Sequence, residues 1–61
     1  MKVYKSEPSK NGWRWKIHKL NDNSLKIFQE NNFSGYWKEK RRFGIFGKGI
    51  KLLKRVMEDK Q

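Results

Sequence analysis

The segment G-W-R-W-K-I-H-K-L, residues 12–20, carries the clearest structural pattern in this chain. Apolar and cationic side chains alternate in it with a strict period of two, which is typical of a half-buried β-strand. The apolar row consists of Trp13, Trp15 and Ile17, and the opposite row consists of Arg14, Lys16 and His18. We expect the apolar row to lie in the core and the cationic row to lie on a solvated face.

Turn-forming residues bound this strand on both sides. E-P-S-K-N precedes it at residues 7–11, and N-D-N follows it at residues 21–23, where Asn and Asp tolerate the left-handed conformation. A second alternating segment, residues 24–29, places Leu25 and Ile27 on one face, and the short connection predicts an antiparallel hairpin. Residues 1–6, around Val3 and Tyr4, form a short segment that favours β-structure.

The middle of the chain carries no clean period. Residues 30–35, E-N-N-F-S-G, predict a loop, and Tyr36 and Trp37 suit either the end of a third strand or the start of a helix. Residues 38–42, K-E-K-R-R, are a charge run. The three glycines between residues 44 and 49 each cost about 1 kcal/mol inside a helix, so we expect a flexible turn there.

From Lys48 onward the apolar period changes to that of a helix. Its apolar stripe consists of Ile50, Leu53 and Met57, with Leu52 and Val56 beside them, and its outer face consists of Lys48, Lys51, Lys54 and Arg55. The sequence therefore predicts one small basic α+β domain over residues 1–61. In it, a two- or three-stranded antiparallel sheet is covered on one face by a C-terminal amphipathic helix, and the stripe meets the apolar rows of the strands.

Composition limits the classes of protein to which the chain belongs. Sixteen Lys/Arg against six Asp/Glu give a net charge of +10 on 61 residues, which makes a polyanion the expected partner. Aromatic residues make up 15% of the chain, too many for a disordered basic tail. The absence of Cys, of a signal-peptide pattern and of a long apolar stretch predicts a cytoplasmic protein without disulfides or a transmembrane segment.

Short motifs in the chain resemble those of the YegP-like domains. The matching pieces, in order, are Val3-Tyr4-Lys5, Gly12-Trp13-Arg14-Trp15-Lys16-Ile17, Gly35-Tyr36, and Gly49-Ile50 leading to Leu53-Lys54. They span most of the chain, which departs from the pattern by several extra residues between Tyr36 and Gly49. The resemblance implies strands followed by a helix and a tendency to form homodimers through strands. The expected topology is also similar to DNA-binding domains of the AP2 and integrase-arm type.

The sequence offers little for catalysis or metal binding. The six carboxylates are scattered, and the adjacent pair Glu58 and Asp59 does not share a helix face. A single His and no Cys exclude the common zinc ligand sets, and His18 alone on a basic strand predicts a polar residue, not a catalytic one. The glycines near residue 47 lack the spacing of a phosphate-binding loop. We therefore expect neither enzymatic activity nor a cofactor.

The basic residues predict a nucleic-acid-binding surface, with DNA favoured over RNA. Residues 38–55 hold eight Lys/Arg and one Glu, more than half of the net charge. The residues expected to contact phosphates are Arg14, Lys16, Lys38, Lys40, Arg41, Arg42, Lys48 and Lys51. Tyr36 and Trp37 are expected to stack on bases or wedge between them. Phe43 and Phe46 also lie among basic residues, with burial under the loop as the alternative.

Two other partners fit the same composition. A basic face can dock an acidic protein, as in a small accessory or regulatory protein of a phage or mobile element. The C-terminal segment from Phe43 to Met57, taken alone, has the pattern of a cationic helix that lies on an anionic membrane. The membrane interpretation is the weaker one, because the apolar stripe of the helix is needed to cover the sheet.

Overall fold

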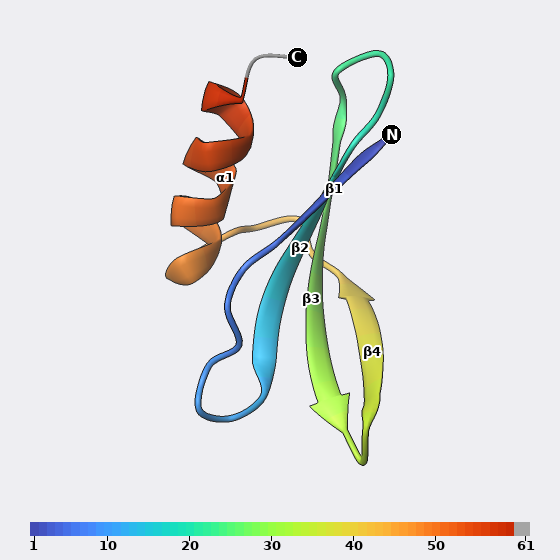
Figure 1. Ribbon diagram of the computed structural model, residues 1–61, viewed down its shortest axis with the longest axis vertical. Helices are drawn as coiled ribbons and strands as arrows, with labels where there is room; N and C mark the ends of the chain where they lie inside the picture. Colours follow the sequence, from blue (N-terminus) through green and yellow to red (C-terminus); the bar gives the residue numbers. More distant parts are fainter. Residues whose placement is uncertain (60–61) are drawn as a thin grey trace.

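The computed structural model describes residues 1–59, which form one antiparallel sheet and one helix (Figure 1). The elements are β1 (Lys2–Lys5), β2 (Trp13–Lys19), β3 (Leu25–Phe33), β4 (Tyr36–Arg41) and α1 (Lys48–Glu58). The strands lie side by side in chain order, so β1 and β4 are the edges of the sheet. The α+β class and the C-terminal helix are confirmed, whereas the sheet has four strands and not the two or three that the sequence predicts.

The additional strand comes from the segment without a clean period. β3 continues to Phe33, and the two-residue turn Ser34–Gly35, with φ of 54° and 87°, leads directly into β4. Positive φ at both turn residues is typical of a tight hairpin whose twist matches that of its strands. The prediction of a loop over residues 30–35 is therefore wrong. Polar side chains are tolerated in this hairpin because charged residues are common on edge strands.

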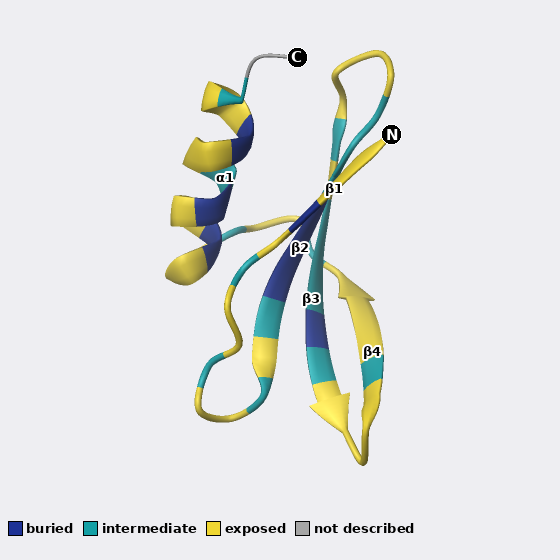
Figure 2. Ribbon diagram, in the orientation of Figure 1, coloured by how far each residue is buried: buried dark blue, intermediate teal, exposed yellow. Residues whose placement is uncertain are grey.

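The core lies between α1 and the first two strands. Its buried members are Tyr4, Trp15, Ile17, Leu52 and Val56, and Leu25, Ile27, Ile45 and Leu53 pack against them. The backbone of α1 contacts β1 and β2 only, so the β3–β4 hairpin extends past the helix (Figure 1). In Figure 2 the buried residues gather where α1 faces β2, and β4 is almost entirely exposed.

The helix presents a different face to the sheet from the one predicted. α1 buries Gly49, Leu52 and Val56, while Ile50 and Met57 are exposed. The reason is the close approach of α1 to β2, because a Cβ atom at Gly49 would lie only 2.8 Å from the indole ring of Trp15. Only a glycine permits this contact, and it turns the Gly49 side of the helix toward the sheet.

The prediction that Trp13 is a core residue is also wrong. Its side chain is 38% exposed, whereas Trp15, two residues later on the same face, is buried. The start of β2 extends beyond the N-terminal end of α1 (Figure 1), so the helix does not cover Trp13. The alternation of β2 is confirmed, but the apolar row is longer than the helix that covers it.

Asp59 fastens the C-terminal end of α1 to β1. Its carboxylate accepts a hydrogen bond from the Tyr4 hydroxyl and another from Lys2 Nζ, at 3.2 Å. These two hydrogen bonds hold the pKa of Asp59 below its usual value. The carboxylate is therefore ionised at neutral pH and joins the last residue of the helix region to the first strand.

Candidate nucleic-acid interface

The sheet face opposite the helix carries a network of ion pairs, and we call it the ion-paired face. Arg14 Nε donates a hydrogen bond to Glu30 Oε1 at 2.8 Å, and Lys16 Nζ lies 3.4 Å from Glu30 Oε2. Lys16 also pairs with Glu39 on β4. Glu30 and Lys16 are 4% and 7% exposed. The prediction of a solvated cationic row is therefore wrong for Lys16, because carboxylates from two neighbouring strands cover it.

The environment of this face fixes the charges of Glu30 and His18. Burial by itself raises the pKa of Glu30, but the hydrogen bond from Arg14 and the charge of Lys16 outweigh it and hold this pKa below its usual value. Burial, followed by the charges of Lys16 and Lys26, lowers the pKa of His18. At neutral pH Glu30 is ionised and His18 is neutral, and Glu30 and Glu39 together offset the charges of Arg14 and Lys16.

Trp37, which the sequence predicts as a stacking residue, lies on the same ion-paired face. The guanidinium carbon of Arg14 lies 3.6 Å from the centroid of the Trp37 ring. This distance is typical of a cation–π contact. Trp37 is half-buried. One side of its ring is thus already covered by Arg14, and both residues hold strands β2 and β4 together across β3.

The helix side of the sheet offers a second surface beyond the N-terminal end of α1 (Figure 1). The aromatic face, as we call it, consists of Trp13, Asn31, Phe33, Tyr36, Lys38 and Lys40. Trp13 pairs with Asn31, which pairs with Lys38, and Phe33 pairs with Tyr36 at the hairpin tip. Because paired residues in antiparallel strands point to the same side, all of these side chains share one face.

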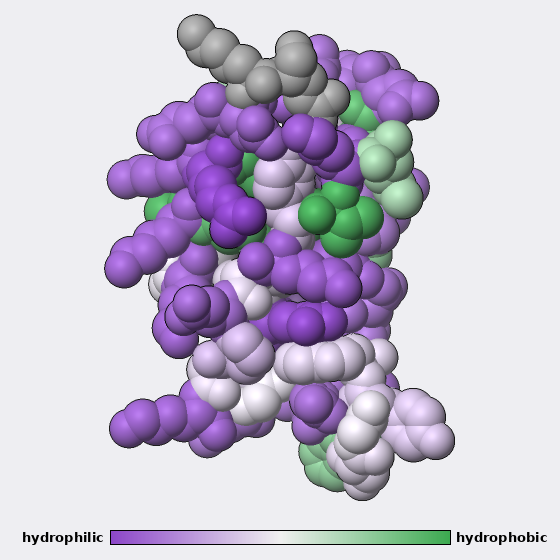
Figure 3. All heavy atoms as spheres, in the orientation of Figure 1, coloured by the Kyte–Doolittle hydropathy of each residue, from purple (hydrophilic) through white to green (hydrophobic). Residues whose placement is uncertain are grey.

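The aromatic rings of this face are open to solvent. Phe33 is 67% exposed and Tyr36 is 75% exposed. A shallow groove of about 430 Å³ runs beside them, lined by Trp13, Asn31, Phe33, Lys38, Glu39 and Lys40. In the space-filling view of Figure 3, pale surface gathers toward the hairpin tip, away from the purple surface over the helix. Aromatic and cationic side chains therefore lie next to each other on this face.

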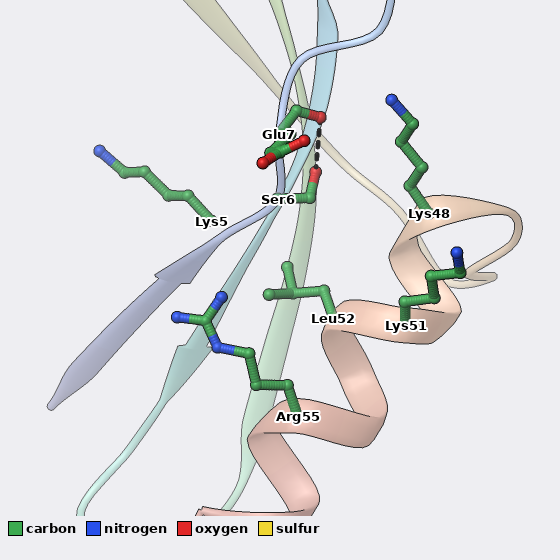
Figure 4. A pocket seen from close by; sticks show the side chains of 7 residues that line it. All are labelled: Lys5, Ser6, Glu7, Lys48, Lys51, Leu52 and Arg55. Carbon is green, nitrogen blue, oxygen red and sulfur yellow. Dashed lines mark hydrogen bonds between the residues drawn. The ribbon is translucent and has the colours of Figure 1, made fainter.

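A cationic groove lies on the other side of the molecule, between the end of β1 and α1. It has a volume of about 320 Å³ and is lined by Lys5, Ser6, Glu7, Lys48, Lys51, Leu52 and Arg55. In Figure 4 Leu52 lies between the end of β1 and α1 with the guanidinium of Arg55 beside it, and the side chains of Lys5, Lys48 and Lys51 extend outward from the rim. Four cations and one carboxylate give this groove a net positive charge. Of the residues predicted to contact phosphates, it brings together Lys48 and Lys51.

The charge run of residues 38–42 does not form a single patch. Lys38 and Lys40 point to the aromatic face, whereas Arg41 pairs with Phe28 on the ion-paired face. Arg42 follows the strand, and its Nε donates a hydrogen bond to Gln29 Oε1 at 2.9 Å. β4 thus divides the run between the two faces of the sheet, because successive side chains of a strand alternate.

The loop before α1 leaves its two phenylalanines open to solvent. Phe43 is 98% exposed. Phe46 is exposed as well, although its ring meets the ring of Trp15 edge-on with centroids 5.1 Å apart. Burial under the loop, the alternative considered from the sequence, therefore does not occur for Phe43 and occurs only on one side of Phe46.

Sequence reasoning missed three residues that the structure places at these surfaces, namely Trp13, Phe33 and Lys5. For Phe33 a signal was present, because the Ser34-Gly35 dipeptide between Phe33 and Tyr36 is typical of a two-residue hairpin turn. For Trp13 and Lys5 the sequence carries no such signal. The exposure of Trp13 depends on where α1 begins, and the position of Lys5 depends on how β1 lies beside α1.

A scan against protein-family models and searches of curated proteins and solved structures found no match to this chain. The resemblance to YegP-like domains therefore stays a prediction. Within residues 1–59, no helix has the length and apolar character needed to cross a membrane. In the same residues, no three His, Cys, Asp or Glu side chains gather in a way that could hold a metal ion.

Proposed function

We propose that this domain binds nucleic acid and acts by binding, without a catalytic step of its own. The observation that carries the proposal is the way the fold distributes charge. Glu30, Glu39 and Asp59 are engaged with Arg14, Lys16 and Lys2. Among the residues that the structure describes, the other Lys and Arg side chains form no ion pair, and six of them line the cationic groove and the aromatic face: Lys5, Lys48, Lys51, Arg55, Lys38 and Lys40.

The outward cations suit phosphate groups. Among the residues that the structure describes, Lys38, Lys40, Lys48 and Lys51 have no carboxylate within 4.0 Å. Binding a polyanion at such residues releases its condensed counterions, which makes affinity strongly dependent on salt. Phosphate contacts of this kind position the protein but carry no sequence information, so we propose binding with little sequence specificity.

The proposal is tested by measuring affinity at several salt concentrations. Duplex DNA, single-stranded DNA, RNA, polyglutamate and anionic lipid vesicles are each titrated with the protein while fluorescence is recorded. Between about 50 and 200 mM NaCl we expect affinity for nucleic acid to fall by about two to three decades, as for four to six phosphate contacts. Tighter binding to polyglutamate than to any nucleic acid would instead favour an acidic protein partner, and tighter binding to vesicles would favour a membrane surface.

A matched pair of variants locates the contacts. Lys48→Gln with Lys51→Gln removes two charges from the cationic groove, and we expect the salt slope on duplex DNA to become shallower by about two units. Lys10→Gln with Lys26→Gln removes the same charge from a loop and from the ion-paired face. If both double variants change the slope equally, binding depends on net charge alone and the groove is not part of the interface.

A further inference from the structure

We infer that the preferred ligand is a single-stranded nucleic acid whose bases stack on the aromatic face. This inference rests on the proposed function and adds the form of nucleic acid and the surface that recognises it. The observation behind it is the placing of Trp13, Phe33 and Tyr36, open to solvent, on one sheet face beside Lys38 and Lys40.

The exposure of these rings needs an explanation, because the chain has few apolar residues for its core. α1 packs against β1 and β2, and Leu25 and Ile27 of β3 pack against the same core, whereas within residues 1–59 the tip of the β3–β4 hairpin has no covering layer. Phe33 and Tyr36 face each other across the tip of this hairpin, where their rings contribute little to the core. Their position is instead suited to stacking, since every base offers a flat apolar face of similar size.

The positive charge of the aromatic face determines which kind of ligand can bind there. Lys38 lies in line with Trp13 and Asn31 across three strands, and Lys40 lies two residues further along β4. A second copy of the chain docked on this face would bring lysine against lysine, which opposes association. A single-stranded nucleic acid offers bases that stack on the aromatic rings and phosphates that pair with the lysines, so it suits both kinds of side chain.

Duplex nucleic acid does not suit this face. Its bases are already stacked on one another, so exposed rings on a sheet gain nothing from them without unstacking the helix. The opposite face of the sheet is unsuited to either form, because Arg14 is engaged with Glu30 and covers the ring of Trp37. The aromatic face is therefore where the two forms of nucleic acid are distinguished.

The test uses the full chain with three probes of equal length: oligothymidylate, oligouridylate and a blunt duplex. Fluorescence anisotropy gives the affinities, and circular dichroism shows that each variant is folded. We expect the wild type to bind the single strands more tightly than the duplex at the same salt. This preference for single strands is the result that supports stacking; comparable affinity for the two strands would mean that neither the 2′-hydroxyl of RNA nor the methyl group of thymine is recognised.

Variants separate stacking from charge. Phe33→Ala and Tyr36→Ala should each weaken single-strand binding by about 5- to 150-fold without changing the salt slope, because a stacked base and not a phosphate contact is lost. Tyr36→Phe keeps the ring and should keep the affinity. Phe43→Ala is the matched control, because it removes a ring that is 98% exposed but lies in the loop before α1.

Lysine variants test the phosphate contacts expected at the aromatic face. Lys38→Gln with Lys40→Gln should make the salt slope for single strands shallower by about 1.4 units, the value for two phosphate contacts. Lys26→Gln with Arg41→Gln removes the same charge from the ion-paired face and should change the slope much less.

Several results would overturn the inference. Folded Phe33→Ala and Tyr36→Ala proteins that bind single strands as the wild type does would leave the proposed function intact and remove the aromatic face from it. Duplex binding as tight as single-strand binding would likewise contradict the inference while leaving the proposed function intact. A wild type that sediments as a dimer, with Phe33→Ala a monomer, would place a second copy on this face. A wild type that binds no nucleic acid at all would instead end the proposed function itself.

Discussion

Glu30 shows at the level of one residue how a chain of net charge +10 still forms a folded sheet. Its carboxylate is buried in the central strand β3 and contacts Arg14 and Lys16 of the neighbouring strand. A buried charge is tolerated only when it is paired and hydrogen-bonded, and Glu30 meets this condition with two cations. It thereby allows two basic residues of β2 to lie in the sheet without repelling each other.

We predict that Glu30→Gln lowers the free energy of unfolding at pH 7 by about 3 kcal/mol. The substitution leaves Arg14 and the buried Lys16 with one negative charge fewer beside them. Urea denaturation followed by tryptophan fluorescence measures the loss. Glu7→Gln, at an exposed position, is the control, and an equal loss in the two variants would contradict the structural role of Glu30.

The same residue predicts how stability changes with pH. Because the pKa of Glu30 is lower in the folded than in the unfolded chain, its contribution is complete above the unfolded pKa of about 4.3. That contribution is lost as the pH falls through the folded pKa. The wild type should therefore lose stability in acid more steeply than Glu30→Gln. Asp59, whose pKa is also lowered, acts in the same direction in both proteins.

At the level of elements, one contact decides how the helix lies on the sheet. Gly49 of α1 rests against the ring of Trp15, and this brings Leu52 and Val56 down onto the same strand. The apolar side chains of α1 cover nearly half of its circumference, which is wider than the part that contacts the sheet, so its amphipathic pattern allows more than one face to be buried. The close approach at Gly49 selects the one that is observed.

We predict that Gly49→Ala lowers the free energy of unfolding by about 1–3 kcal/mol, as over-packing of a core does. The new methyl group would lie 2.6 Å from Ile45 Cγ1 and 2.8 Å from the Trp15 ring. This outcome opposes helix propensity, which favours Ala over Gly by about 1 kcal/mol. Thermal denaturation of Gly49→Ala beside Gly44→Ala, where a Cβ meets nothing within 4 Å, measures the difference. A Gly49→Ala protein more stable than the wild type would show that α1 has room to move away from β2.

At the level of the whole molecule, the fold separates cations that are paired with carboxylates from cations that are exposed to solvent. The domain measures 35 × 19 × 19 Å, so many of its cations lie within about one or two Debye lengths of each other at 0.1 M salt. The ion pairs of Glu30 are buried and little screened, whereas the outward lysines repel each other through solvent. Added salt therefore weakens repulsion more than attraction.

We predict that the Tm of the free protein rises with NaCl concentration. Relief of about 1 kcal/mol of repulsion would raise the Tm of a domain of this size by about 4–8 °C. Differential scanning calorimetry between low and physiological salt measures the shift, and sodium gluconate in place of NaCl controls for specific binding of chloride. A Tm that falls with salt would show that attractive ion pairs dominate the electrostatics of the fold.

Features that depend on local pattern could be predicted from the residues alone. The alternation in residues 12–20 defines β2, the N-D-N turn defines its hairpin with β3, and the apolar period after Lys48 defines α1. Each of these signals is contained within one element and its turn. The excess of positive charge is likewise a property of composition, and it is the basis of the proposed function.

Features that depend on contacts between elements follow from how the helix and the strands pack together. β4 carries mainly charged side chains and no strand pattern, and it forms because β3 pairs with its backbone and Glu39 reaches Lys16. Trp13 and Trp15 are equivalent in the sequence, yet one is exposed because α1 begins too late to cover it. The aromatic face exists for the same reason. A repeating pattern specifies which side of a strand is apolar, but the length and position of the covering helix decide how much of that side remains open to a ligand.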